Sequence, residues 1–436
     1  MPEFAQNLSI EAVFTSIAAG VAAYLVWTHF RTSTDKKPKA PALPTSLSPE
    51  SIAVVKATAP VVAEHALEIT SLFYKTMFAN RPEVLHYFNK AHQVNQAQPK
   101  ALADSVIAYA THIEELDKLG PLVQKIAERH VALAILPEHY FIVHDNLMKA
   151  IGEVLGSAVT PEIAAGWSEA VLFLAYVCIT AEEKLYQEKE SKKGGWRYEK
   201  EFVVHSKKSV AEDTVQFQFK MGDADADKAP SFDFVAGQYL TVRVPALGDL
   251  VAPRHYTVTC QPGSNVLEMT QRLVDGGVMS TYMHKYLNVG DKVLLGPPSG
   301  VFVPVSKTKD MVLISAGIGI TPMVAFYRSC KSQVKAVCHL DQSRERHACR
   351  EVFETCPVKV YHYSKSKEGR PNLTGLATKL AKAGGTNADY YICGPNSFME
   401  NMEDALRMLG CNSIHAEVFG TGSVPTNSKT KCPFHF

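Results

Sequence analysis

His130 is the side chain in this sequence that most directly invites a chemical role. The stretch QKIAERHVALAILPEHY, residues 124–140, follows a helical period and places His130 on its apolar stripe. An imidazole there is compatible with a hydrogen-bonded core residue, a metal ligand or a general base. Pro137 is expected to begin the next helix and to bring Tyr140 back toward the histidine. These residues alone leave the three roles open.

A glycine turn in VLISAGIGITPM is the second pattern with chemical potential. Gly317 and Gly319 follow an apolar strand and precede a helix, so the backbone can approach a phosphate that the helix N-terminus also attracts. YYICGPNSF later gives another strand that ends in a Cys–Gly–Pro loop. Because ligands bind outside the carboxyl ends of parallel strands, the two loops are expected to face one site. The motif is not G-x-G-x-x-G, and a turn without a ligand is an equal interpretation.

A third pattern combines GQYL, RHYT and DGGVMS in that order. In R-x-Y-T on a strand, the arginine can pair with a diphosphate and the tyrosine can stack on a flat ring. The hydroxyl residue can reach a ring nitrogen. RHYT alone is better explained as a strand rich in aromatic residues that carries an exposed arginine. Three such elements in order, ahead of a dinucleotide-type domain, favour a site for a flat ring that carries a diphosphate.

Three patterns of apolar residues divide the chain into the elements that would position these groups. Helical periodicity punctuated by prolines predicts an all-α domain over residues 48–193. Short alternating runs such as VQFQFK and YLTVRV predict an antiparallel β-barrel over residues 194–305. From residue 306 to 424, the strands MVLISA, VKAVCHL, KVYHY and DYYICG alternate with helical stretches, which predicts βαβ units and a parallel sheet.

The composition describes ordinary globular material in several domains. A chain of 436 residues is too long for one hydrophobic core. A net charge of +1 gives no reason to expect a nucleic-acid partner. The nine cysteines contain no C-x-x-C pair, which argues against a zinc motif or a disulfide framework and suits a reducing compartment.

Residues 12–30 depart from this composition because they contain no Asp, Glu, Lys or Arg. A bilayer-spanning helix needs about 20 such residues, so residues 1–30 are expected to form an N-terminal transmembrane anchor. Basic residues follow directly, so the body of the protein is expected to face the cytosol. The alternative is an extra helix packed on the body. Residues 31–47 are expected to be a linker, and residues 425–436 a tail without an assigned role.

The ordered motifs GQYL, RHYT, GGVMS, GIGITP and CGP resemble those of the ferredoxin-NADP reductase-like family of FAD/NAD(P)H modules. With the helical domain in front, residues 48–422 resemble a flavohaemoglobin. The resemblance implies a globin that binds haem b, an FAD-binding barrel and an α/β domain that binds NADH or NADPH. It also implies nitric oxide, O2 and NAD(P)H as small-molecule partners. The body is expected to be monomeric.

The resemblance makes His130 the proximal ligand of the haem iron. Tyr140 and Glu182 match family positions that hydrogen-bond around the proximal imidazole. A carboxylate on the distant ring nitrogen fixes the tautomer and makes the ligand more basic, which favours O2 activation over storage. A solvated helix charge is the alternative interpretation of Glu182.

On the other haem face, the resemblance implies that Tyr74 donates a hydrogen bond to bound O2 and that Gln98 supports it. Leu102 is expected to control access, and Phe88 to wedge against the haem. Vertebrate oxygen carriers have a histidine where Gln98 falls. The difference favours redox turnover over carriage.

The reductase motifs assign further cofactor contacts by the same resemblance. The residues matched to FAD are Tyr239, Arg254, His255, Tyr256, Thr257, Gly276, Gly277, Ser280 and Phe419. The residues matched to NAD(P)H are Gly317, Ile318, Gly319, Ile320, Thr321, Pro322, Cys393, Gly394 and Pro395. Val418 stands where the family usually has cysteine, so no thiol role is expected there, and Gly420 ends the matched segment.

The combined interpretation is an NAD(P)H-dependent nitric oxide dioxygenase that converts nitric oxide and O2 to nitrate. Two alternatives remain: a haem-based gas or redox sensor with a resetting reductase, and an NAD(P)H oxidase or peroxide reductase. Ser343, Arg344 and Arg346 offer groups that could receive a 2′-phosphate, and a solvated charge run is an equal interpretation.

Overall fold

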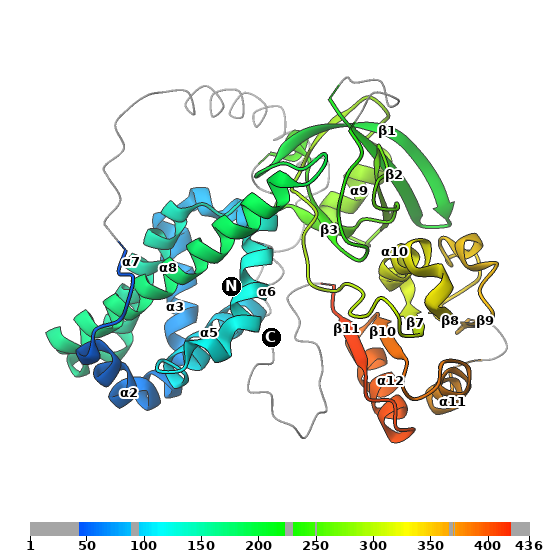
Figure 1. Cartoon of the computed structure of the whole chain (residues 1–436). Coiled ribbons are helices and arrows are strands. Elements are labelled where there is room, and N and C mark those ends of the chain that lie inside the picture. Colours follow the sequence, from blue (N-terminus) through cyan, green and yellow to red (C-terminus); the bar gives the residue numbers. More distant parts are fainter. Residues whose placement is uncertain are drawn as a thin grey trace, which may run out of the picture.

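The computed structural model describes residues 43–88, 96–222, 230–248, 251–365, 369 and 371–419. The expected anchor at 1–30, most of the expected linker, Gly420 and the expected tail at 425–436 lie outside the described residues. Helices form the first part of the chain, and two sheets with their covering helices form the rest (Figure 1).

The first part is entirely helical, as the periodicity predicted. Prolines stand at the first positions of several helices, where a missing N–H costs nothing. Helix α2 lies against α5 and α8, α3 lies against α5 and α7, and α6 lies against α8. The elements are α2 (Pro49–Glu64), α3 (Ala66–Asn80), η1 (Pro82–Tyr87), α5 (Ala97–Thr111), η2 (Leu116–Leu119), α6 (Gly120–Ala132), α7 (Pro137–Leu155), η3 (Gly156–Ala158) and α8 (Pro161–Ser191).

Six antiparallel strands follow, in the order β4-β3-β6-β1-β2-β5. The bridge between Val258 and Met269 joins the end of β4 to β5 and closes the sheet into a barrel. Phe202, Phe217 and Phe219 fill its core without any exposure. The elements are β1 (Lys200–Ala211), β2 (Thr214–Met221), β3 (Tyr239–Arg243), η5 (Pro245–Leu247), β4 (Arg254–Thr257), β5 (Leu267–Arg272), α9 (Val278–Lys285) and β6 (Lys292–Leu295).

The last part is a five-stranded parallel sheet in the order β11-β10-β7-β8-β9. The four predicted strands are present, and β11 is an addition at the edge next to β10. The elements are β7 (Met311–Ala316), η6 (Gly317–Gly319), α10 (Ile320–Cys330), η7 (Lys331–Gln333), β8 (Val334–Asp341), η8 (Arg350–Phe353), β9 (Val358–Tyr363), α11 (Leu373–Gly384), β10 (Asp389–Cys393), α12 (Asn396–Met408) and β11 (Ile414–Glu417).

Helix α8 is the one helix among the described residues whose length and composition would allow it to cross a bilayer. It packs against α2, α6 and α7, and Trp167 and Ala170 on it are 1% and 0% exposed. The core helix of a globular domain has the same composition, and these contacts favour that interpretation of α8.

A buried imidazole in the parallel-sheet part makes stability depend on pH. His347 is 4% exposed; its Nδ1 lies 2.9 Å from the Tyr363 hydroxyl, and its Nε2 has no hydrogen-bond partner within the described structure. Burial, with His339 close by, lowers the pKa of His347 to about 2. In the unfolded chain the imidazole of His347 is therefore protonated below about pH 6.5, whereas in the folded chain it stays neutral. The free energy of unfolding consequently falls as the pH drops below about 6.5.

We predict that His347→Gln flattens this acid dependence. Between pH 7 and pH 5 the wild type loses about 2 kcal/mol through this group, and the glutamine variant does not. Thermal unfolding followed by circular dichroism at both pH values measures the difference. His205→Gln, on an exposed position of β1, is the control and should keep the wild-type dependence. Equal pH profiles for all three proteins would contradict the prediction.

Candidate functional site

Three helices bring His130, Tyr140 and Glu182 into one hydrogen-bonded group. His130 Nδ1 lies 2.7 Å from Glu182 Oε1 and 2.9 Å from the Tyr140 hydroxyl. The Tyr140 hydroxyl also donates to Glu182 Oε1. Glu182 is 3% exposed, so it is not the solvated charge that its neighbours on α8 suggested. We call these three residues the proximal group.

The proximal group leaves one nitrogen of the imidazole available. A carboxylate oxygen accepts hydrogen bonds, so the proton of His130 belongs on Nδ1 and the lone pair on Nε2. Nε2 makes no hydrogen bond within the described structure, and the side chain is 33% exposed. Such a histidine, with a free lone pair and a carboxylate behind it, fits a metal-ligating imidazole.

Helix α6 presents two different faces around His130. Ala127 and Val131 are fully buried against α8, whereas Ile126 and His130, which belong to the predicted apolar stripe, are only half-buried. An apolar stripe that the protein does not cover fits one side of a flat apolar group such as haem.

Cys178 adds a contact that the sequence did not predict. It lies one helical turn before Glu182 on α8 and is 4% exposed, and its thiol hydrogen-bonds the Tyr140 hydroxyl. Burial, with Cys178 and Glu182 nearby, raises the pKa of Tyr140 well above its usual value. Tyr140 therefore stays protonated and keeps its orientation. The i, i+4 spacing from Glu182 was the available signal in the sequence.

Tyr74 is the centre of a second, separate group. It is 7% exposed, and its ring lies 5.7 Å from those of Phe78 and Phe88. Gln98 hydrogen-bonds its hydroxyl, and burial raises the pKa of Tyr74 above its usual range. The phenol is therefore a neutral donor. Leu102 is half-buried in the same core cluster.

No hydrogen bond or ring contact joins Tyr74 to His130 within the described residues. The two groups nevertheless border one apolar cluster. Phe88, beside Tyr74, and Leu122, on the helix that carries His130, both pack against it. Two polar groups that share an apolar cluster without touching fit opposite faces of one planar ligand.

The expected flavin residues gather on β3 and β4. The rings of Tyr239 and His255 lie 4.6 Å apart, and His255 Nδ1 lies 2.9 Å from the Thr241 hydroxyl. Burial, with Arg129 and Arg254 nearby, lowers the pKa of His255 to about 3, so its imidazole is neutral at physiological pH. The paired aromatic rings and neutral imidazole fit a flat heterocycle.

Other residues expected to contact the flavin make hydrogen bonds within the protein. Arg254 Nη1 donates to the carbonyls of Ala252 and Pro253, at 2.7 and 3.1 Å. The Ser280 hydroxyl binds the turn that contains Gly276 and Gly277, accepting from Val274 N at 3.1 Å. Tyr256 hydrogen-bonds Gln271. Ser280 thus shapes the start of α9, where a phosphate could lie.

Two loops meet at the carboxyl ends of β7 and β10. Gly317 has a left-handed φ of 58°, and a Cβ on Gly319 would overlap the carbonyl oxygen of Cys393. The Thr321 hydroxyl donates to Thr257 at 3.2 Å and so ties α10 to the barrel. Ile318, Gly394 and Pro395 lie on the same two loops, and Ile320 and Pro322 lie in the first turn of α10. The two loops therefore lie together, at the place where parallel sheets bind ligands.

The remaining expected residues lie near these groups. Phe419, just after β11, is 49% exposed, whereas Val418 packs into the core. Glu417 faces Lys125 and Arg129 of α6, and burial raises its pKa.

The residues considered for a 2′-phosphate lie after β8. Arg346 already pairs with Asp213, whereas Arg344 is exposed. The arginine run is therefore divided between an internal ion pair and a solvated side chain.

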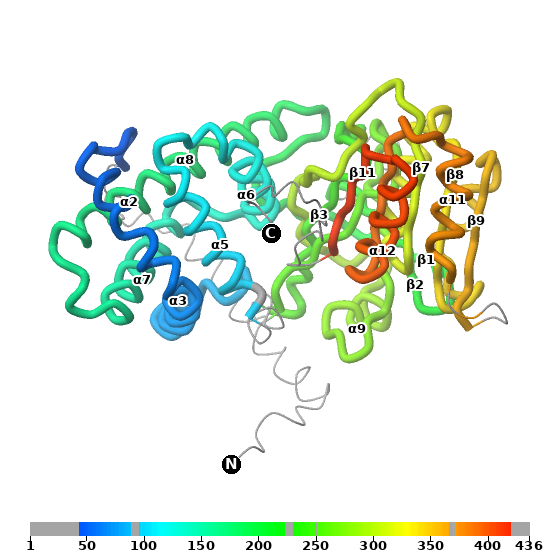
Figure 2. Tube along the Cα trace, turned by 90° about the horizontal axis from the view of Figure 1, so that it is seen from below, coloured from blue at the N-terminus to red at the C-terminus, as the bar shows by residue number. Residues whose placement is uncertain are grey.

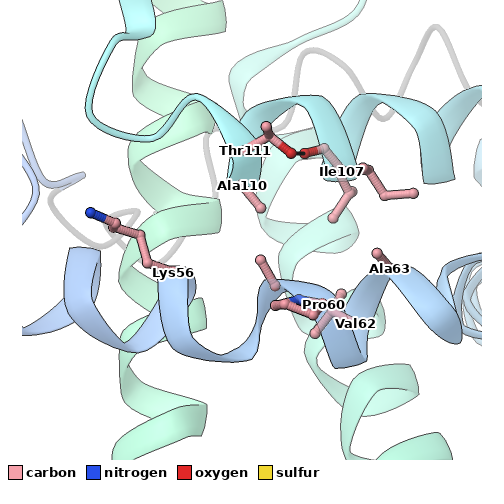
Figure 3. Close-up of a pocket in the computed structure, with 9 residues that line it drawn as sticks. Lys56, Pro60, Val62, Ala63, Ile107, Ala110 and Thr111 are labelled. Carbon is pink, nitrogen blue, oxygen red and sulfur yellow. Dashed lines mark hydrogen bonds between the residues drawn. The ribbon is translucent and has the colours of Figure 1, made fainter. Parts of the chain in front are cut away.

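A separate cavity of about 320 Å³ lies between α2 and α5. Lys56, Pro60, Ala63, Ile107 and Ala110 are among the side chains around it (Figure 3). None of its lining residues belongs to the proximal group or to the Tyr74 group.

Two family models match the chain. Globin matches residues 71–178, and Oxidoreductase FAD-binding domain matches residues 201–303. A flavohemoprotein of Rhodopirellula baltica is 36% identical over 86% of this chain and 98% of its own length. Flavohemoprotein A of Dictyostelium discoideum is 34% identical over the same shares.

The structural comparison agrees with the sequence comparison. A crystal structure of flavohemoglobin from Malassezia yamatoensis with bound FAD and heme aligns with a TM-score of 0.72 at 28% identity. The alignment covers 86% of this chain and 100% of that one.

We predict that Gly319→Ala destabilises the parallel-sheet part by about 1–3 kcal/mol, because the added methyl group meets a backbone carbonyl that cannot rotate away. Thermal unfolding measures the loss. Gly152→Ala on α7 has open space around it and should raise stability by about 0.5–1 kcal/mol. A neutral or stabilising effect of Gly319→Ala would show that the two loops do not touch as described.

Proposed function

The chain belongs to the flavohaemoglobin family, and from this premise we propose that it is an NAD(P)H-dependent nitric oxide dioxygenase. When bound, NAD(P)H, FAD and haem b supply the electron transfer and the dioxygen chemistry by which nitric oxide and O2 become nitrate. The observation that carries the proposal is the proximal group, because a carboxylate-backed imidazole in the same chain as a flavin module suits O2 activation.

On this proposal His130 holds the haem iron through Nε2. Glu182 Oε1 accepts a hydrogen bond from His130 Nδ1–H, with 2.7 Å between the two heavy atoms, which keeps the imidazole in one tautomer and increases its electron donation. Tyr140 orients the carboxylate, and Cys178 orients Tyr140. Because Glu182 is buried, water does not compete for its hydrogen bond with His130.

Tyr74 is the proposed donor on the opposite face. Its neutral phenol can stabilise negative charge that develops on oxygen, and Gln98 holds the phenol in place. Phe88 and Leu102 form the apolar wall, which limits the entry of water.

For the reductase half we propose the contacts that the family motifs assign. Tyr239, His255 and Tyr256 border the flavin, with Arg254 and the Gly276–Gly277 turn near its diphosphate. The Gly317–Gly319 turn and the Cys393–Pro395 loop receive NAD(P)H. We further propose domain limits of 48–193, 194–305 and 306–424, and a monomeric body.

We predict that Tyr74→Phe lowers nitric oxide consumption by about tenfold or more at matched haem content, because one hydrogen-bond donor to the reacting oxygen is lost. The assay follows nitric oxide with NAD(P)H and O2 present. Tyr109→Phe is the matched control, since Tyr109 is buried in the same apolar cluster but its hydroxyl donates to the Ala170 carbonyl. Wild-type consumption by Tyr74→Phe would remove Tyr74 from the mechanism. An inactive, fully loaded wild type would refute the function.

The N-terminal anchor is a separate proposal that rests on the charge-free residues 12–30. We predict that the full chain stays with the membrane fraction through salt and carbonate washes, whereas a chain without residues 1–42 is released. Recovery of both proteins in the supernatant would refute the anchor.

A further inference from the structure

The helical part meets the barrel along α6 and the carboxyl end of α8, which lie on its side nearest the barrel (Figures 1 and 2). At this boundary Lys189 Nζ donates to Glu128 Oε2 at 2.9 Å and to the Pro298 carbonyl at 2.9 Å. Glu128 Oε2 also accepts from the Gly300 N–H at 3.1 Å. We call Glu128 and Lys189 the boundary pair.

The boundary pair is buried, since Glu128 is 8% and Lys189 is 6% exposed. Charged groups are rarely buried without complete pairing, because removal from water is costly. Here the two charges meet each other, and each also binds a backbone group of the segment that follows β6. The pair therefore depends on both parts of the protein being in place.

Residues 296–300, which we call the β6 segment, run along the turn of α6 that carries His130. At one end, a Cβ on Gly296 would lie 2.8 Å from the Ala132 carbonyl oxygen. At the other end, Gly300 binds Glu128. His130 lies midway between these two contacts along α6.

The β6 segment is equally close to the expected flavin site. Ser299 and Tyr239 exchange backbone hydrogen bonds at 2.8 and 3.0 Å. A Cβ on Gly300 would lie 2.7 Å from the Tyr239 ring, and Gly300 has a left-handed φ of 114°. Tyr239 in turn contacts His255. One short segment thus connects the His130 turn to the strand that borders the flavin.

We propose that Glu128 and Lys189 are positioning residues that hold the flavin-binding strand against the His130 turn and thereby set the rate of electron transfer from flavin to haem. The inference rests on the proposed function for the identity of the two redox groups. Electron transfer slows steeply with distance, so a small displacement of the β6 segment has a large kinetic effect. The charged groups of Glu128 and Lys189 bind each other, the Gly300 N–H and the Pro298 carbonyl, and none of these is a proposed cofactor contact.

The test separates two steps in the full-length protein loaded with haem and FAD. In anaerobic stopped flow, NAD(P)H is mixed with oxidised enzyme, and flavin reduction and haem reduction are followed at their own wavelengths. Glu128→Gln leaves Lys189 without its counter-charge. It should slow flavin-to-haem transfer about tenfold or more, while flavin reduction stays within about twofold of the wild type.

A double variant provides the rescue. Glu128→Gln combined with Lys189→Gln replaces the ion pair with two amides that can still bind Gly300 N and Pro298 O. We expect it to recover most of the lost transfer rate, as a coupled pair should. Glu201→Gln, in the half-exposed pair with Lys292 on the barrel surface, is the control and should transfer electrons at the wild-type rate.

Amide hydrogen exchange without cofactors gives an independent readout. Glu128→Gln should speed exchange in the β6 segment and leave β7 unchanged. Wild-type transfer rates in Glu128→Gln would overturn the proposal, as would equal slowing of flavin reduction, which indicates general damage. Intact flavin-to-haem transfer in a wild type that consumes no nitric oxide would refute the proposed function and leave this inference standing. A wild type without flavin-to-haem transfer would refute both.

Discussion

The hydrogen bond between Glu182 and His130 is the interaction on which the helical part depends. It joins α8 to α6, and Tyr140 adds α7 to the same group. A buried carboxylate must have its hydrogen bonds satisfied, so the crossing of these three helices is tied to the orientation of one imidazole. The same contact that stabilises the helices also fixes which ring nitrogen of His130 keeps its lone pair.

In the reductase half, the features that suit flat and phosphorylated ligands lie at the junction of the two sheets. The barrel supplies paired aromatic rings on β3 and β4, and the parallel sheet supplies two loops in close contact. The hydroxyl groups of Thr321 and Thr257 link the two sheets where these features meet. The boundary pair then links the barrel to the helices. Rigid contacts therefore extend from the loops after β7 to helix α6.

Much of this architecture could be predicted from the sequence. The run MVLISA coincides with β7, and Pro137 begins α7. The strand β6 (KVLL) was not predicted, because its three apolar residues are consecutive and do not alternate with polar ones. The helical periodicity did not show that α2 and α3 are separate helices, which the structure divides at His65.

The site was predictable in part, and for different reasons. The helix start at Pro137 already indicated that Tyr140 returns toward His130. The resemblance supplied Glu182, since neither spacing nor composition connects it with a histidine 52 positions away. Cys178 had a signal in its spacing from Glu182. The boundary pair had none, because Glu128 and Lys189 stand 61 positions apart and each resembles an ordinary solvated helix charge. Only the packing of α6 on α8 brings them together.

The close passage of the β6 segment along α6 also has a consequence for how freely the two halves can be exchanged. Fused redox proteins are often regarded as interchangeable modules. Here a side chain at position 296 would meet the Ala132 carbonyl of α6, and Glu128 accepts a hydrogen bond from one particular backbone N–H, that of Gly300. A globin moved onto another reductase would need that same close approach beside the helix that corresponds to α6. The contact between α6 and residues 296–300 therefore has to be kept together with the two cofactor sites when the halves of such a protein change.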